Sequence, residues 1–277
     1  MSARLRNPVF FVGCGRSGTT LLARILATHP EIAVYPYEAN ELWHPKTFPW
    51  TRSKVVVPPI WADARTYTTI SLEHRDLRDD GRLAGAFGAY QLFSGGKRFV
   101  NKSVLITFML DYVLRLFPEA RFIHLVRDGR AVALSFARKE HGKMDRAPQR
   151  FEEQGYLLSM DELVEAFALH WKEHIDEIEH QKDRLSLAAA GRIHELRYED
   201  LCVEPARELD ALAAFIGVDR QGFSPRAYEQ VEDRNYKFRS DLSAEVRTSL
   251  VALLAPTLAL KGYPTDEHET YGPPWAA

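Results

Sequence analysis

The sequence of 277 residues contains few cysteines, no excess of charge of either sign and no long hydrophobic run. Cys14 and Cys202 are too few for a disulfide scaffold or a thiolate metal site, and they indicate a reducing compartment, with the cytoplasm as the expected location. A formal net charge of −2 excludes the overall positive field of a general nucleic-acid-binding protein. No stretch approaches the roughly 18 consecutive apolar residues of a membrane span, and the apolar run of residues 8–12 is too short for a secretory signal.

Hydrophobic residues make up 45% and charged residues 27% of the chain, a balance typical of a globular protein. Short apolar runs alternate with segments of helical periodicity. The expected strands are Val9–Val12, Arg98–Lys102, Arg121–Val126 and residues 193–196. The expected helices are residues 20–28, 105–117, 128–139, 159–178 and 205–216. This alternation predicts a three-layer α/β fold, in which a mostly parallel central sheet has helices on both faces.

The whole chain, residues 1–277, is expected to form one such domain, because no linker or repeat divides it. Three segments do not follow the alternation of strands and helices: residues 40–96, 141–156 and 219–241. Long excursions from a compact α/β core are usually lids or binding loops. These segments are therefore expected to be irregular and to select or enclose a ligand.

A glycine-rich loop, residues 13–20 (GCGRSGTT), lies between the first expected strand and the first expected helix. At such a turn the free backbone N–H groups and the positive end of the helix dipole bind anions. The loop therefore predicts a P-loop-like nucleotide site with a phosphate-like group in it.

Two familiar phosphate-binding patterns fit this loop only in part. Residues 13–18 read G-x-G-x-x-G, the dinucleotide fingerprint, with Glu38 placed to hold a ribose, which would indicate a nicotinamide-dependent oxidoreductase. As an ATP-type loop, the segment has Thr19 where a lysine should reach the terminal phosphates. The expected strand 121–126 also lacks a metal-binding Asp at its end. A magnesium-dependent kinase and a non-catalytic nucleotide-binding module remain the alternative functions.

In a third interpretation, side-chain donors surround one tetrahedral anion: Arg16, Ser17, Thr19 and Thr20. With these donors, the loop resembles the 5′-phosphosulfate loop of the sulfotransferases that use 3′-phosphoadenosine 5′-phosphosulfate (PAPS). Residues 127–135 (RDGRAVALS) are similar to a second segment of that family. There a strand-end Arg, matched by Arg127, and a helical Ser, matched by Ser135, hold the 3′-phosphate. The resemblance implies PAPS as donor, adenosine 3′,5′-bisphosphate (PAP) as product and no metal.

The resemblance implies roles for further residues. The resemblance includes Gly15 and Gly18 in the nucleotide loop. It is strongest with the branch that contains tyrosylprotein and many bacterial sulfotransferases, because Arg16 stands where cytosolic small-molecule enzymes usually have lysine. Lys102, in the sequence Asn-Lys-Ser, is similar to the catalytic lysine of the family. With Arg16 it would stabilise the leaving phosphate and the transferred group. Further nucleotide contacts are implied for Tyr198, Lys237 and Arg239.

A general base is needed to take the proton of the acceptor hydroxyl. Glu38 resembles the glutamate that follows the second strand in the tyrosylprotein-like branch. One more residue than usual separates Pro30 from Glu38, so Glu41 and His44 are alternatives for this role.

The acceptor itself is a hydroxyl of a small molecule, a carbohydrate, a lipid or a peptide, and the sequence does not decide among them. Four aromatic residues, Trp43, Phe48, Trp50 and Trp61, could line its pocket or form the core of a long loop.

His170 and His174 lie four residues apart and share a helix face, which is one pattern of a metal site. The HExxH arrangement is absent, because Trp171 follows His170 directly. Amphipathic packing beside Trp171 explains the pair better than a metal.

Overall fold

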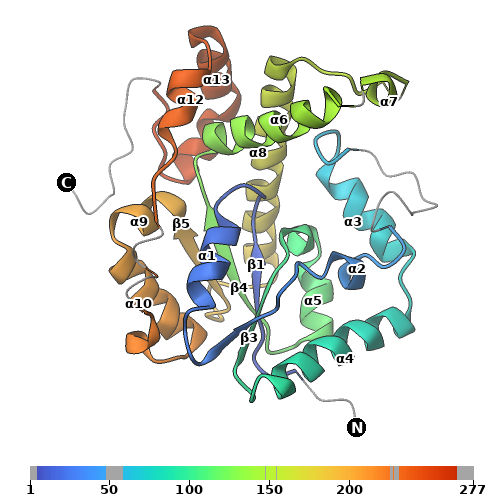
Figure 1. Cartoon of the computed structure of the whole chain (residues 1–277), viewed down its shortest axis with the longest axis vertical. Helices are drawn as coiled ribbons and strands as arrows, with labels where there is room; N and C mark the ends of the chain where they lie inside the picture. The colour runs from blue at the N-terminus through green and yellow to red at the C-terminus, as the bar shows by residue number, and fades with distance from the viewer. Residues whose placement is uncertain are drawn as a thin grey trace.

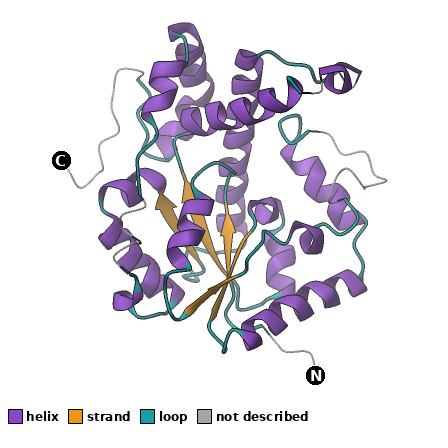
Figure 2. Ribbon diagram, in the orientation of Figure 1, coloured by secondary structure: helices purple, strands orange, loops and turns teal. Residues whose placement is uncertain are grey.

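A computed structural model describes residues 5–47, 59–146, 148–153, 155–224, 227 and 231–266. Its centre is a five-stranded sheet in the order β2-β3-β1-β4-β5, and every strand pair is parallel (Figure 2). The strands are β1 (Val9–Val12), β2 (Ile32–Val34), β3 (Arg98–Lys102), β4 (Arg121–Val126) and β5 (Ile193–Arg197). The predicted α/β class is thus confirmed, and the sheet is wholly parallel in the described part of the chain.

Helices cover both faces of this sheet, as Figure 1 shows. Successive side chains of a strand point to opposite faces. Accordingly, Val9 and Phe11 of β1 pack with α1 (Thr19–Leu26) and α10 (Pro205–Ile216). On the opposite face, Phe10 and Val12 pack with α4 (Leu77–Phe93), α5 (Leu110–Leu116) and α8 (Met160–Arg184). Burial on both faces explains why β1 reads as a continuous apolar run.

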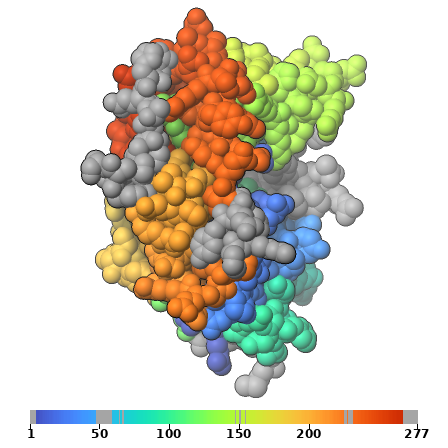
Figure 3. Space-filling model, turned by 60° about the vertical axis from the view of Figure 1, so that its left-hand side comes forward, coloured from blue at the N-terminus to red at the C-terminus, as the bar shows by residue number. Residues whose placement is uncertain are grey.

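A third apolar cluster joins α6 (Gly129–Met144), α8, α12 (Tyr236–Asp241) and α13 (Ala244–Leu260). Phe136 of α6 stacks on Phe167 of α8, with ring centroids 4.6 Å apart. In Figure 3 the orange-red surface of the C-terminal helices adjoins the yellow-green region that contains the end of α6. This cluster holds α6 and α12 beside the edge of the sheet where β1 and β4 end.

The predicted starts of α6 and α8 and both ends of α10 are confirmed, because the capping residues behave as their side chains require, whereas α6 and α8 continue past their predicted ends to Met144 and Arg184. Ser159 and Glu162 form a reciprocal capping box at the start of α8. Asp128 accepts a hydrogen bond from the backbone N–H of Arg130 at the start of α6. Pro205 stands in the first turn of α10, and Gly217 ends that helix with φ of 79°.

The expected helix 105–117 is in fact two helices. A short 3₁₀ helix, η1 (Val104–Phe108), precedes α5, and the two are separated at Met109, whose φ of −141° is not helical. The backbone N–H of Leu110 donates to Gln181 Oε1 of α8, at 2.9 Å. This hydrogen bond to α8 therefore satisfies the backbone N–H of Leu110 in the first turn of α5.

The prediction that residues 40–96 are irregular is wrong for most of that segment. It contains α2 (Asn40–Trp43), α3 (Ala64–Glu73) and α4. Gly81 and Gly85 lie inside α4 and lower its helix propensity, which weakened the local signal.

The other two segments expected to be irregular also contain helix. Residues 141–156 include the end of α6 and α7 (Pro148–Glu153). Residues 219–241 include η2 (Arg220–Gly222) and α12. A further short helix, α9 (Tyr198–Val203), lies outside these segments and directly follows β5.

The four aromatic residues of segment 40–96 do not form one pocket wall. Trp43 is buried in the core and donates from Nε1 to Asn101 Oδ1, at 2.9 Å. Trp61 packs against Phe167, with ring centroids 5.6 Å apart. Phe48 and Trp50 lie outside the described residues.

Among the helices that the structure describes, none is long and apolar enough to cross a bilayer.

Five of the described histidines are buried, and two of them, His44 and His174, illustrate the effect of burial on their pKa. His44 at the end of α2 is 0% exposed and His174 in α8 is 5% exposed. Burial lowers the pKa of His44 to about 3, with a contribution from nearby Arg75. Burial likewise lowers the pKa of His174 to about 4. Both rings are therefore neutral at pH 7.

These histidines should make the fold sensitive to acid. As the pH falls below about 6.5, the unfolded chain binds protons that the folded chain does not, so stability that is full above pH 6.5 is lost toward the folded pKa values. At about pH 5 we expect a loss of about 2 kcal/mol for each histidine. Urea unfolding at about pH 7.5 and about pH 5 measures the loss.

His174→Gln should reduce this acid sensitivity, whereas replacement of the exposed His180 by Gln should not. An equal free energy of unfolding at both pH values would contradict the burial argument.

Candidate functional site

The predicted site residues come together where three neighbouring strands end. β1 lies between β3 and β4, with Phe11 opposite Lys102 and Val12 opposite His124. The chain leaves β1 toward β2 on one side of the sheet and returns to β4 on the other. In open α/β sheets, ligands bind at the carboxyl ends of the strands where the strand order reverses in this way.

The glycine loop is shaped by close contacts with two other helices. Gly18 caps α1 with φ of 99°, and a Cβ there would lie 2.7 Å from Tyr198 Cδ2 of α9. A Cβ at Gly15 would lie 2.7 Å from Phe136 Cζ of α6. Arg16, between them, has φ of 68°, a left-handed conformation that is rare for a residue with a side chain. Close packing against α6 and α9 therefore constrains the shape of the loop.

Polar groups of this loop are left without partners. No side chain caps the first turn of α1, and that turn has no acidic residue. The Ser17 side chain is 1% exposed, and its hydroxyl makes no hydrogen bond to any residue that the structure describes. A buried hydroxyl and uncapped N–H groups are what a bound anion would satisfy.

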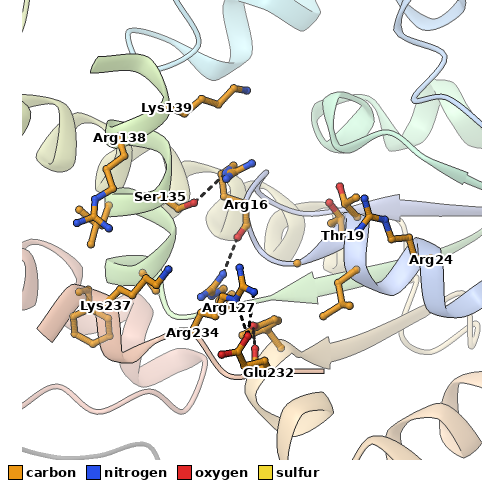
Figure 4. Close-up of a pocket in the computed structure, with 17 residues that line it drawn as sticks. Arg16, Thr19, Arg24, Arg127, Ser135, Arg138, Lys139, Glu232, Arg234 and Lys237 are labelled. Atoms are coloured by element: carbon orange, nitrogen blue, oxygen red, sulfur yellow. Dashed lines mark hydrogen bonds and ion pairs between the residues drawn. The ribbon is translucent and has the colours of Figure 1, made fainter. Parts of the chain in front are cut away.

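Direct contacts join the two segments predicted to bind the phosphates. Arg16 Nε donates to Ser135 Oγ of α6, at 3.0 Å, and Arg127 Nη1 donates to the carbonyl oxygen of Arg16, at 3.3 Å (Figure 4). The guanidinium of Arg127 also lies 4.2 Å from the ring centroid of Tyr198, in cation–π contact. Arg16, Arg127, Ser135 and Tyr198 thus form one connected group.

A cavity of about 740 Å³ opens beside this group. Its lining has seven cationic side chains and one acidic side chain, Glu232. The cationic residues are Arg16, Arg24, Arg127, Arg138, Lys139, Arg234 and Lys237. The protein therefore has a strongly positive cavity although its net charge is −2.

Most of the predicted nucleotide residues line this cavity: Arg16, Gly18, Thr19, Thr20, Arg127, Ser135, Tyr198 and Lys237. Gly15 and Ser17 are not in the lining, and Ser17 is buried within the loop. Arg239 is not in the lining either, and its guanidinium lies 5.5 Å from the ring centroid of Phe238. The contact of Arg239 with the nucleotide stays a prediction.

Sequence reasoning missed four cations of the cavity. Arg24 follows Thr20 by four residues, and Arg138 and Lys139 follow Ser135 by three and four, so helical spacing could have found all three. Arg234, in contrast, lies in a loop without periodicity and pairs with Glu232 at 3.0 Å.

Partial burial lowers the pKa of Lys139, and the neighbouring cations Lys143 and Arg16 lower it further. This direction is expected for an ammonium that shares a small volume with other cations.

Two of the three predicted catalytic residues, Lys102 and Glu38, form a second group beside the glycine loop, whereas the third, Arg16, belongs to the first group. Lys102 Nζ makes an ion pair with Glu38 and donates to Thr20 Oγ1, at 3.3 Å. Glu38 also accepts from Asn40 Nδ2, at 3.1 Å. Glu41 is exposed in α2, whereas the burial of His44 separates its ring from any acceptor in the cavity. Of the three candidate bases, Glu38 is in contact with the predicted catalytic lysine.

His170 and His174 take part in aromatic packing, as the sequence favours. Their ring centroids are 4.3 Å apart, His170 packs on Phe136 and Phe167, and His174 packs on Phe108. Cys14 lies beside them, with its sulfur within 4.8 Å of their ring nitrogens, a neighbour that the sequence did not indicate.

The sulfotransferase family model matches residues 8–222. The chain belongs to the sulfotransferase family. The match covers β1 to η2, and so it includes both phosphate segments and the pair Glu38 and Lys102.

Individual relatives agree with this assignment. This sulfotransferase is 24% identical, over 78% of its length and 67% of the relative's, to a Caenorhabditis briggsae protein designated a protein-tyrosine sulfotransferase. It is 25% identical to the omega-hydroxy-beta-dihydromenaquinone-9 sulfotransferase Stf3 of Mycobacterium bovis, over 87% and 71% of the two chains. The solved structure of mouse sulfotransferase SULT7A1, complexed with PAP, has a TM-score of 0.53 at 15% identity and covers 93% of this chain and 87% of its own.

Gly18→Ala should damage the sulfotransferase fold at the loop. The substitution puts a side chain at φ of 99° and against Tyr198, so we expect a loss of about 1–3 kcal/mol in the free energy of unfolding. In Gly142→Ala, the added Cβ meets no atom within 4 Å, and this control should gain up to about 1 kcal/mol of helix stability. Chemical denaturation compares the two, and equal effects would refute the packing account.

Proposed function

We propose that this sulfotransferase transfers a sulfuryl group from PAPS to a hydroxyl acceptor, without a metal ion. The observation that carries the proposal is that the turn after β1 and the turn after β4 each present an arginine to one cavity. Arg16 lies in the first turn, Arg127 in the second, and both line that cavity. A nucleotide with a 5′-phosphosulfate and a 3′-phosphate needs two such places at a fixed separation.

The residues present fit this donor. The uncapped first turn of α1, with Thr19 and Thr20 in the cavity lining, would hold the 5′ group, and the unpartnered hydroxyl of Ser17 lies in the same loop. Arg127 and Ser135 would hold the 3′-phosphate, and Tyr198 supplies an aromatic face beside them. Cations that line the cavity would balance the negative charge of the ligand.

When bound, PAPS supplies the sulfuryl group and a phosphate leaving group. Lys102 and Arg16 would donate hydrogen bonds to the oxygens on which negative charge develops during transfer. Lys102 would do so from the end of β3, where its contact with Thr20 already places the ammonium beside the loop. Fixed cations near the reacting oxygens perform the charge stabilisation that a metal ion performs in other enzymes.

Glu38 would accept the proton of the acceptor hydroxyl. It follows β2, on the β3 side of the sheet, and its carboxylate contacts Lys102. The acceptor would therefore enter from the side of α2, with its hydroxyl between the carboxylate and the loop.

Hydroxyl chemistry agrees with the names of the two relatives above, one a protein-tyrosine and one an omega-hydroxy-menaquinone sulfotransferase. We place the reaction in the cytoplasm, because both cysteines are free thiols.

The donor is tested by thermal stabilisation. PAP at about 100 times its Kd should add about 2.7 kcal/mol and raise Tm by several degrees, with no metal present. AMP lacks the 3′-phosphate and should stabilise less at the same concentration. A larger shift with ATP and Mg²⁺ would favour a kinase, and a larger shift with NADH would favour an oxidoreductase. Binding of PAP with no turnover of any hydroxyl acceptor would indicate a non-catalytic module.

The catalytic pair is tested by turnover of PAPS. Lys102→Ala should lower kcat by about 100-fold or more, since it removes one donor to the developing charge, and leave the Kd for PAP within about threefold. Glu38→Gln should lower kcat and remove the acid limb of the pH–rate profile. Glu41→Gln is the matched comparison on α2. If Glu41→Gln, and not Glu38→Gln, removes that limb, the base is Glu41.

A further inference from the structure

Arg127 is fixed by a residue that does not line the cavity. Its Nε donates to Asn235 Oδ1, at 2.8 Å, and its plane lies against the Tyr198 ring. Asn235 is the residue directly before α12, 108 positions further along the chain. Among the described residues Nη2 of Arg127 has no hydrogen-bond partner, so this part of the guanidinium is free for a ligand in the cavity.

The orientation of the Asn235 amide is set by a buried acid. Asn235 Nδ2 donates to Glu199 Oε1, and a carboxylate can only accept hydrogen bonds. The nitrogen end of the amide must therefore face Glu199, which leaves the oxygen end to face Arg127. With the amide reversed, its oxygen would face the carboxylate oxygen of Glu199, acceptor against acceptor. Its nitrogen would face Arg127 Nε, donor against donor.

Glu199 is held in place by two further donors. The Asp128 backbone N–H donates to Oε1 at 3.1 Å, and the Tyr263 hydroxyl donates to Oε2 at 2.8 Å. The side chain is 2% exposed. Burial, with the neighbouring Asp128 carboxylate, raises the pKa of Glu199 to about 7. Burying an acid costs free energy unless the acid is hydrogen-bonded, and these donors supply the hydrogen bonds.

We propose that Asn235, oriented by Glu199, is a positioning residue that turns the guanidinium of Arg127 toward the 3′-phosphate of the nucleotide. This inference rests on the proposed function, which assigns the 3′-phosphate to Arg127. It adds that recognition of this phosphate depends on a chain of hydrogen bonds from Tyr263 through Glu199 and Asn235 to Arg127.

The test is calorimetric binding of PAP and AMP to the full chain at about pH 8, above the pKa of Glu199. Asn235→Leu keeps the size of the side chain and removes both polar ends. It should weaken PAP by about tenfold and AMP by less than about twofold, because AMP has no 3′-phosphate. In the Arg127→Ala background, Asn235→Leu should change PAP affinity by less than about twofold, since it acts through the guanidinium.

Glu199→Gln supplies the conservative comparison, because its amide oxygen can still accept from Asn235. It should keep PAP affinity within about threefold of the unaltered chain, whereas Glu199→Leu should resemble Asn235→Leu. If Glu199→Leu does not fold, Asn235→Leu carries the test alone.

The inference is overturned if Asn235→Leu weakens PAP and AMP equally, or weakens PAP by the same factor with and without Arg127. Either result would mean that Asn235 only supports the local structure. The proposed function fails in a different way: the unaltered chain would not distinguish PAP from AMP, or Arg127→Ala would leave PAP affinity unchanged.

Discussion

The backbone turn between β1 and α1 is the constraint on which the rest of the site depends. At this turn the chain passes so close to Phe136 and Tyr198 that Cβ atoms at Gly15 and Gly18 would lie 2.7 Å from those rings. The same turn puts Arg16 in a left-handed conformation, with its side chain at Ser135 and its carbonyl oxygen at Arg127. Packing of α6 and α9 against one short loop therefore brings the two turns that we propose as phosphate sites to one cavity.

The second requirement is that positive charge is collected with only part of it neutralised. Of the seven cations that line the cavity, Arg234 pairs with Glu232 and Arg138 pairs with Asp241, whereas two buried acids nearby have other partners. Asp128 is buried in an ion pair with Arg130, at 2.7 Å, and Glu199 accepts from three donors. These acids hold the framework of α6 and the loop before α12, while Arg127 presents its free donors to the cavity. A protein of net charge −2 can in this way attract a highly charged nucleotide.

The strand order separates the residues that we propose for the 3′-phosphate from those that we propose for the acceptor. Arg127 and Ser135 follow β4 on one side of β1, whereas Lys102 ends β3 on the other side and contacts Glu38 beyond β2. The glycine loop, which follows the central strand, lies between them. A donor bound along the loop would thus be held at its 3′-phosphate on one side and meet the acceptor on the other.

The sequence by itself determined the parallel α/β fold, the glycine loop, the two segments of the predicted nucleotide site and the capped ends of α8 and α10. Each of these depends on residues within about 20 positions of one another, where strand and helix periods, caps and turn residues act locally. It did not determine the helices in residues 40–96, because glycines inside α4 obscure its pattern. Only the tertiary structure decided that Glu38 meets Lys102 across 64 residues and that Asn235 meets Arg127 across 108. Such pairs form because strand order and helix packing bring distant segments together, and no local preference of the chain encodes that proximity.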